Sequence, residues 1–230
     1  MKLRSLTDIG IKRKDNQDNY WSARLSIEGE EVGVICLCDG MGGLDKGGLA
    51  SKTVVEAVKN FFSSDIDMVK LRGVLSRAND DLYDISKMGN ISLGTTCTVI
   101  LIKAGVYEIL HIGDSRCYHF SKSKGNKLAI LTKDHTVVEK YKQSGRELPP
   151  SLLKKYQNTL TRCIGVSSKM ELDYYTGTYS DDDIFLVCSD GFWHHLSSED
   201  FGNLDDLESL VKKYIAMGET DNITAVWIGV

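Results

Sequence analysis

Four aspartates of this 230-residue chain stand where a run of apolar residues ends or begins. Asp39, Asp114 and Asp190 each follow such a run directly, and Asp221 comes just before the last one. A carboxylate at the rim of a buried strand is costly unless a partner compensates its charge. If the strands share one sheet or a sandwich, these acids can gather at one end. Two carboxylates 4 Å apart repel by about 1 kcal/mol in water and about 4 kcal/mol at an effective dielectric of 20.

Such a cluster needs protons or hard cations. Its donors are oxygens, and the sequence shows no clustered His or Cys, so we expect Mg²⁺ or Mn²⁺ in preference to Zn²⁺. The alternative for each acid taken singly is a turn, because Asp-Gly is common in hairpins. Gly40 favours the cation, since a glycine lets its carbonyl come close to an ion. The segment 39–43 lacks the spacing of phosphate-binding glycine loops, which disfavours a nucleotide site.

A polar segment near the start of the chain adds a guanidinium, an amide and a further carboxylate, from Arg13, Gln17 and Asp18. Alone, this segment is typical of solvated surface charge. Arginine, however, presents a planar fork that binds a phosphate through two hydrogen bonds. Beside a cluster of divalent ions, an arginine is the group that a phosphate substrate requires.

The elements that must position these residues are mostly strands. Short apolar and β-branched runs predict strands at 2–8, 18–25, 32–38, 95–103, 106–113, 183–189 and 224–230. Apolar residues at helical spacing predict helices within 50–61, 71–85 and 204–217. Strands and helices do not alternate along the chain. This order indicates antiparallel sheets with helices on the outside, an α+β fold.

The length is comfortable for a single domain, 1–230. With 28 Lys and Arg against 32 Asp and Glu, the net charge of -4 gives no general attraction to nucleic acid or anionic membranes. No apolar run is long enough for a membrane helix, and the first residues lack the apolar stretch of a secretory signal. We therefore expect a cytoplasmic protein without membrane insertion. Nothing in the sequence signals oligomerisation, so we expect a monomer.

The six cysteines show no CxxC spacing, and most lie inside apolar runs. We interpret them as reduced, buried small hydrophobic side chains. The alternative is a disulfide framework or a zinc site.

Nine short motifs follow one another along the chain: TDIG (7–10), RxxNQD (13–18), DGMGG (39–43), GTT (94–96), GDSR (113–116), DHT (134–136), LTRxxG (160–165), SDG (189–191) and DNxT (221–224). This series resembles the metal-dependent serine/threonine protein phosphatases of the PP2C (PPM) family, especially the compact bacterial members. The resemblance spans residues 3–230. It implies two antiparallel β-sheets packed as a sandwich, flanked by pairs of α-helices, with an acidic mouth at one end.

The resemblance also implies a role for each acid. Asp39 would bridge two metal ions, and the Gly40 carbonyl would bind the first of them. Asp190 and Asp221 would hold the second ion. Asp114 would help to bind a looser third ion, as in bacterial relatives.

Around these ions, the resemblance implies that Gln17 and Asp18 act through metal-bound waters and that Arg13 binds the substrate phosphate. A hydroxide bridging the ions would attack phosphorus directly, without a phosphoenzyme. Two positions depart from the family pattern. Met41 stands where many eukaryotic members carry a histidine assigned as general acid, and Gln17 replaces a glutamate. The acid for the leaving group is therefore unassigned, and a metal-bound water oriented by Asp18 is our candidate.

The segment 133–160 corresponds to the mobile flap of the family. Its lysines and arginines would favour acidic substrates, or else form a solvated helix face. We expect His135 to hydrogen-bond and not to catalyse, and Thr161 and Arg162 to tie the flap to the sheet. Phosphorylated protein substrates of a cognate Ser/Thr kinase are the implied partners. The alternative function is a catalytically silent binding or regulatory module of the same fold.

Overall fold

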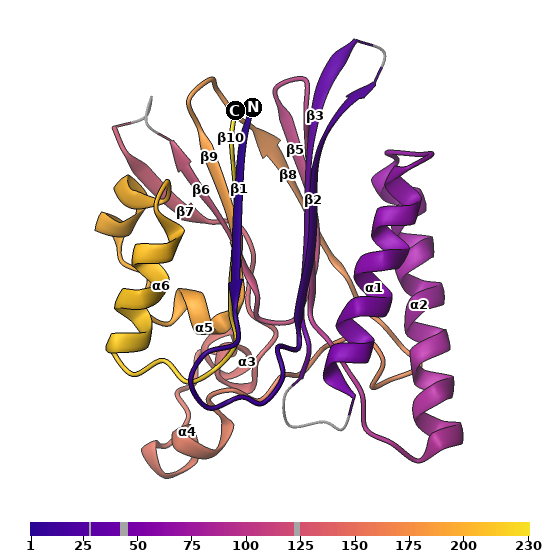
Figure 1. Cartoon of the computed structure of the whole chain (residues 1–230). Coiled ribbons are helices and arrows are strands. Elements are labelled where there is room, and N and C mark those ends of the chain that lie inside the picture. The colour runs from indigo at the N-terminus through magenta and orange to yellow at the C-terminus, as the bar shows by residue number, and fades with distance from the viewer. Residues whose placement is uncertain (28, 42–45, 122–124) are drawn as a thin grey trace.

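Two antiparallel sheets pack face to face in the computed structural model, which describes residues 1–27, 29–41, 46–121 and 125–230 (Figure 1). Each sheet has five strands, in the orders β1-β10-β9-β6-β7 and β2-β3-β4-β5-β8. The strands are β1 (Lys2–Asp8), β2 (Asp18–Ile27), β3 (Glu30–Asp39), β4 (Cys97–Lys103), β5 (Val106–Ile112), β6 (Arg116–Ser121), β7 (Lys127–Ile130), β8 (Asp173–Thr178), β9 (Ile184–Cys188) and β10 (Ile223–Gly229). The α+β fold with two antiparallel sheets is confirmed.

The seven strands that the sequence predicts are all present, with ends that differ by at most two residues. The strands β6, β7 and β8 are additional. β7 has only four residues, and β8 is an edge strand that alternates half-buried and exposed side chains around Gly177. A continuous apolar run is the signal that these strands lack.

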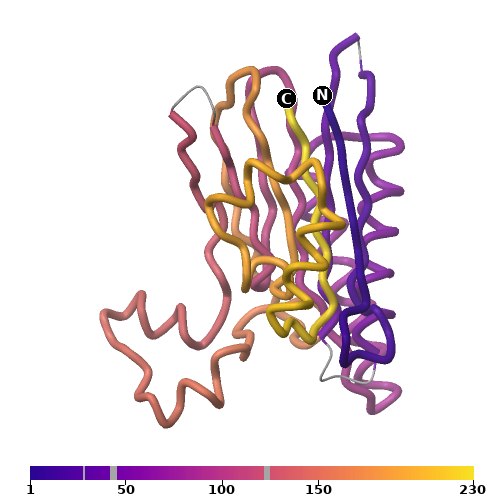
Figure 2. The backbone as a smooth tube through the Cα atoms, turned by 60° about the vertical axis from the view of Figure 1, so that its left-hand side comes forward, coloured from indigo at the N-terminus to yellow at the C-terminus, as the bar shows by residue number. Residues whose placement is uncertain are grey.

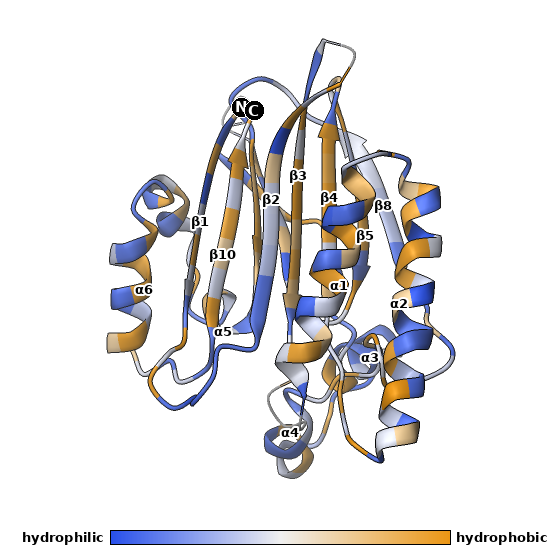
Figure 3. Cartoon of the chain, turned by 45° about the vertical axis from the view of Figure 1, so that its right-hand side comes forward, coloured by the Kyte–Doolittle hydropathy of each residue, from blue (hydrophilic) through white to orange (hydrophobic). Residues whose placement is uncertain are grey.

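Helices cover the outer face of each sheet (Figures 1 and 3). The pair α1 (Gly47–Phe62) and α2 (Met68–Gly89) lies over the β2-to-β8 sheet, and α6 (Leu207–Ala216) lies over the other with α5 (Asp190–Trp193) and the 3₁₀ helix η1 (Ser198–Asn203). The three predicted helices are confirmed. Figure 3 shows their apolar stripes, which the 3.6-residue period placed on the side facing the sheets.

The hydrophobic core forms three layers, one between the sheets and one beneath the helices on either side. β3 shows why its sequence is apolar without alternation. Ile35 and Leu37 lie between the two sheets, whereas Val34 and Cys36 pack under α1 and α2. Both faces of the strand are covered, so both sets of side chains are apolar.

The sandwich places the candidate site at the end opposite both termini (Figure 1). At that end β2 begins, β3, β5 and β9 end, and β10 begins. The flap, which contains α3 (Val137–Gln143) and α4 (Pro150–Tyr156), extends from the body there (Figure 2). Within the described part of the chain, no helix combines the length and the apolar character needed to cross a bilayer.

The layer between the sheets should carry much of the stability. Ile100 is 0% exposed in this layer, and Ile130 on the edge strand β7 is 52% exposed. We expect Ile100→Ala to lower the free energy of unfolding by about 2–5 kcal/mol, because it leaves a cavity. The matched change Ile130→Ala should cost about 1 kcal/mol or less. Urea denaturation measures both, and equal losses would contradict this packing.

Candidate active site

Asp18 connects the two sheets at the acidic end. It starts β2 and stands directly opposite Asp39, the last residue of β3, in the antiparallel register. Its Oδ2 accepts hydrogen bonds from the hydroxyls of Ser189 (2.8 Å) and Thr224 (2.6 Å), which belong to the other sheet. Its Oδ1 is buried and has no hydrogen-bond partner among the described residues. One oxygen of Asp18 is thus held between the sheets and the other remains for a further ligand.

Asp39 lies at the centre of the carboxylates. Burial raises its pKa well above the usual range, and repulsion from Asp18, Asp190, Asp114 and Asp221 raises the pKa further. These are the four acids that the sequence placed around Asp39, so the structure brings the predicted set into mutual electrostatic contact.

The same causes act on its neighbours. Burial raises the pKa of Asp18 to about 7, against the two hydroxyl hydrogen bonds, and Asp190 and Asp221 raise that pKa further. Burial and then repulsion from Asp190 raise the pKa of Asp114 to about 8. Burial also raises the pKa of Asp190, which His194 partly offsets. At neutral pH, ionising these carboxylates is therefore less favourable in the folded protein than in water.

Asp190 and Asp221 reach the mouth from adjacent strands of one sheet. Asp190 follows β9 and begins α5, and Asp221 lies two residues before β10. The two segments touch closely, because a Cβ on Gly191 would lie 2.2 Å from the Asn222 carbonyl oxygen. Only a glycine fits after Asp190.

Arg13 forms a two-pronged ion pair with Asp221. Its Nε donates to Oδ1 at 2.7 Å and its Nη2 donates to Oδ2 at 2.5 Å. The hydrogen bond to Asp221 raises the pKa of Arg13, and Asp190 and Asp39 contribute to the rise. The guanidinium thus lies among the carboxylates, with 37% of its side chain exposed to solvent.

Asn222 pins the loop that carries Arg13. Its side-chain amide donates to the carbonyls of Ile9 (2.8 Å) and Asp15 (3.2 Å), and its Oδ1 accepts from the Gln17 backbone N–H (2.9 Å). The sequence analysis gave Asn222 no role, although the DNxT motif contains it. This single side chain fixes both ends of the loop.

Gln17 and Gly40 meet through their backbones. The Gly40 N–H donates to the Gln17 carbonyl at 3.1 Å, and Ser51 Oγ donates to the same carbonyl at 2.6 Å. A Cβ on Gly40 would lie 2.6 Å from this oxygen and from the Gly47 backbone. Gly40 is therefore required for the close approach. Gly42 and Gly43 of the same motif lie outside the described residues.

Asp114 lies beside Asp190 at the side of the mouth that faces the flap. Its backbone carbonyl accepts a hydrogen bond from Trp193 Nε1 at 2.9 Å. The guanidinium of Arg116 stacks on the same indole, 3.5 Å from its ring centroid, and pairs with Asp134. A pocket of about 440 Å³ opens here between Asp114 and the flap helices.

This donor set fits hard divalent cations. Several carboxylates face one another, one buried oxygen of Asp18 lacks a partner among the described residues, and the charges are incompletely compensated. Oxygen donors of this kind are the ligands of Mg²⁺ and Mn²⁺. Asp39, Asp190 and Asp221 with the Gly40 carbonyl could hold such ions, and Asp114 could hold one further out.

The cysteines differ from expectation in one respect. All six are free, and five are fully buried, as predicted. Three of them nevertheless cluster, because the sulfurs of Cys36, Cys38 and Cys97 lie within 4.8 Å of one another. They belong to the core under α1 and α2, on the face of β3 opposite to Asp39. The expectation of no clustered cysteines was wrong because it used sequence spacing, whereas pairing of β3 with β4 brings them together.

The sandwich fold and the carboxylate cluster at its end can now be compared with those of known proteins. The family model described as "Protein phosphatase 2C" matches residues 11–226. The protein phosphatase PhpP of Streptococcus pneumoniae (strain D39) is 28% identical over 244 residues, covering 99% of this chain and 97% of PhpP. The serine/threonine phosphatase stp of Listeria welshimeri is 25% identical over 240 residues, covering 96% and 93%.

Solved structures of serine/threonine phosphatases have the same fold as this chain. The serine/threonine phosphatase of S. agalactiae has a TM-score of 0.82 at 27% identity and covers 100% of this chain and 99% of its own. The catalytic domain of the phosphatase PstP, solved in complex with two manganese ions, has a TM-score of 0.80 at 25% identity, covering 98% and 96%. This chain belongs to the protein phosphatase 2C family and is a phosphoprotein phosphatase, a hydrolase of phosphoric monoesters.

The carboxylate cluster predicts an unusual pH dependence of stability. Unfolded aspartates ionise near pH 3.9, whereas the pKa of Asp18 is raised to about 7 and that of Asp114 to about 8. Raised pKa values mean that the folded state binds protons more tightly. The contribution of these two aspartates to stability in EDTA should thus be greatest below about pH 4 and be lost progressively as the pH rises to about 7–8. We expect Mn²⁺ to abolish this loss.

Urea midpoints between pH 5 and pH 8.5, in EDTA and in Mn²⁺, test this expectation. Asp18→Asn is the control, since it removes one proton site and should flatten the curve measured in EDTA. An unchanged curve in this variant would show that another group with a raised pKa, such as His194, causes the pH dependence.

Proposed function

We propose that this protein hydrolyses phosphoserine and phosphothreonine in proteins with the help of Mg²⁺ or Mn²⁺. The observation that carries the proposal is the cluster of mutually repelling carboxylates around Asp39 in a chain of the protein phosphatase 2C family. The relatives named serine/threonine phosphatases support the substrate class, and the two manganese ions of PstP support the cofactor.

We assign the ligands residue by residue. Asp39 would lie between two ions, with the Gly40 carbonyl on the first and Asp190 and Asp221 on the second. Asp114 would hold a third, weaker ion. Such ions supply an acidified water as nucleophile and neutralise charge on the phosphate.

Arg13 would bind the phosphate oxygens. It belongs to a loop that Asn222 fixes at both ends, and its guanidinium lies beside Asp221 within reach of solvent. The pairing with Asp221 holds the guanidinium plane at the mouth before the substrate arrives, so little side-chain entropy is lost on binding. Asp221 would therefore serve both as a ligand and as a guide for Arg13.

Asp18 would control a proton at the mouth. Its Oδ2 is committed to two hydroxyls, so Oδ1, which has no partner among the described residues, would accept a hydrogen bond from a metal-bound water. Asp18 is buried, so it would act on the leaving oxygen through a water. Gln17 would act from the same shell, and Met41 has no proton to give.

The remaining assignments follow from this chemistry. A phosphoserine or phosphothreonine substrate has to be made by a protein kinase, so we propose a cognate Ser/Thr kinase as the source. We further propose that residues 1–230 act as one domain, as a monomer in the cytoplasm, with 133–160 as a flap beside the mouth.

Metal-dependent turnover is the first test. We expect the purified protein to hydrolyse a phosphothreonine peptide with Mn²⁺ or Mg²⁺ and to lose activity in EDTA. Asp190→Ala should lower kcat by at least about 100-fold, because it removes charge that stabilises the transition state. Folded wild-type protein that shows no turnover with either ion would instead support a catalytically silent module.

Arg13 gives a second test, specific for the phosphate. We expect Arg13→Ala to lower kcat/KM by about 100-fold and Arg13→Lys to be intermediate, because lysine keeps the charge and loses the fork. Lys14→Ala, a neighbouring exposed cation, is the control and should have little effect. Equal losses in the two alanine variants would show that the loop contributes only general positive charge.

A further inference from the structure

The two ends of the flap are joined where they leave the sandwich. We call residues 133–136 and 159–162 the flap root. Thr136 forms an isolated bridge with Leu160, and the Thr161 N–H donates to the His135 carbonyl at 2.7 Å. Whatever moves one end of the flap root therefore acts on the other.

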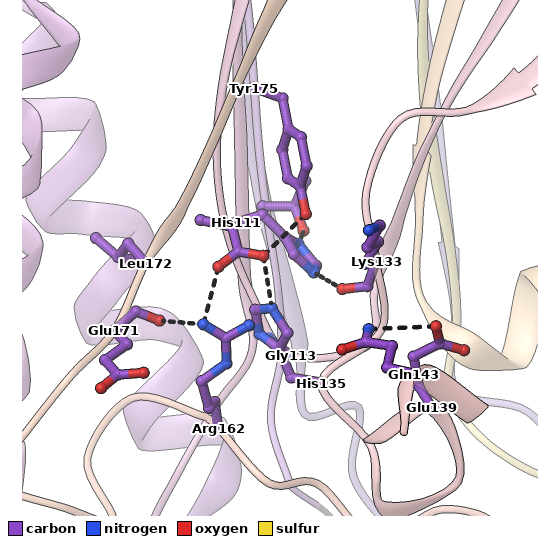
Figure 4. A network of polar contacts seen from close by, with 12 residues as sticks. His111, Gly113, Lys133, His135, Glu139, Gln143, Arg162, Glu171, Leu172 and Tyr175 are labelled. Atoms are coloured by element: carbon purple, nitrogen blue, oxygen red, sulfur yellow. Dashed lines mark hydrogen bonds and ion pairs between the residues drawn. The ribbon is translucent and has the colours of Figure 1, made fainter. Parts of the chain in front are cut away.

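His135 connects the flap root to Gly113, the residue before Asp114 (Figure 4). The His135 N–H donates to the Gly113 carbonyl at 2.7 Å, and the Gly113 N–H donates to His135 Nδ1 at 3.0 Å. His135 thus binds both backbone polar groups of one residue, Gly113. The bonding is reciprocal, so the position of Gly113 depends on the orientation of the imidazole ring.

The backbone conformation of Gly113 has to be fixed by neighbouring groups. Its φ of +112° lies in a region that L-residues rarely adopt, and a Cβ there would lie 2.5 Å from the Thr96 side chain. A glycine in this conformation is free to rotate unless its neighbours fix it. Because Asp114 follows directly, a rotation at Gly113 would redirect the Asp114 backbone and its carboxylate.

Asp173 on β8 fixes the form of the imidazole that this contact requires. Its Oδ2 accepts from His135 Nε2 at 3.2 Å, so the ring proton lies on Nε2 and Nδ1 is left as an acceptor for Gly113. Burial lowers the pKa of His135, which keeps the ring neutral. The same tautomer recurs in His111, whose Nε2 donates to the Lys133 carbonyl at 3.1 Å.

Asp173 is itself held by the far end of the flap root. Arg162 Nη1 donates to Asp173 Oδ1 at 2.8 Å, and the Tyr175 hydroxyl donates to Oδ2 at 2.9 Å (Figure 4). A continuous chain of hydrogen bonds thus runs from Arg162 through Asp173 and His135 to Gly113. The predicted tie between Arg162 and the sheet is confirmed, and its further contact with the acidic mouth was not foreseen.

We propose that His135 is a positioning residue that couples the flap root to Asp114 through Gly113, so that the flap and the ion at Asp114 respond to each other. This inference rests on the proposed function, which makes Asp114 an ion ligand. Its consequence is regulatory. A phosphoprotein that displaces the flap would alter the affinity for the outermost ion, and that ion would in turn bias the flap.

Two substitutions of His135 distinguish a role in positioning Gly113 from a general contribution to stability. His135→Asn places an amide oxygen where Nδ1 lies and keeps the acceptor for Gly113. His135→Gln places an amide nitrogen near the position of Nε2 and keeps only the donor to Asp173. We would titrate each protein with Mn²⁺ by calorimetry without substrate, and record the melting temperature and the Mn²⁺ dependence of peptide hydrolysis.

We expect His135→Gln to weaken the loosest Mn²⁺ site by about tenfold, as is typical for residues that orient a metal ligand, and His135→Asn to stay within about threefold of the wild type. The control is His119→Asn, which loses the Nε2 donor and so breaks the comparable His119–Asp183 pair at the opposite end of β9. It should lower the melting temperature without changing Mn²⁺ binding.

Unchanged Mn²⁺ affinity in His135→Gln would overturn the inference. Equal weakening in the Asn and Gln variants would also overturn it, since the acceptor for Gly113 would then be irrelevant. Failure of the proposed function looks different, because the wild type itself would neither bind Mn²⁺ nor hydrolyse the peptide.

Discussion

The repulsion among carboxylates at one end of the sandwich is the constraint on which the rest of the structure depends. Asp18 and Asp39 face each other by strand register, and Asp190 and Asp221 arrive from the other sheet. At an effective dielectric of 20, two carboxylates 4 Å apart would repel by about 4 kcal/mol. The hydroxyls that bind Asp18 offset only part of this energy. Because the core between the sheets prevents the strands from separating, bound protons or cations have to offset the remainder.

The fold holds the acids close together mainly by fixing the backbone that carries them. Each acid lies at a strand end, where its position follows from the sheet. The connecting loops are then held by single polar residues: Asn222 for the loop of Arg13, and His135 for the turn at Gly113. The groups that we propose as ligands thus lie at strand ends and on the adjoining loops of a rigid scaffold, which is the usual place for function. The residues that we propose for phosphate and ion binding meet the flap at one end for this reason.

Sequence reasoning located the acids because each adjoins a long apolar run, and apolar runs mark buried strands. It placed the three long helices because their faces follow a helical period. It missed β6, β7 and β8, which lack a continuous apolar run. It also missed the Cys36 cluster and the link from Asp173 to His135, because these depend on strand register and on tertiary contacts between distant segments. Local patterns carry no information about such partners.

The central claim is that the carboxylates bind divalent ions together. Anomalous diffraction at the manganese edge, from crystals grown with Mn²⁺, tests this most directly. We expect strong peaks in contact with Asp39 and with Asp190, and a weaker one beside Asp114. A map without anomalous density among these carboxylates, from crystals of protein that hydrolyses phosphopeptides in the same Mn²⁺ solution, would contradict the account.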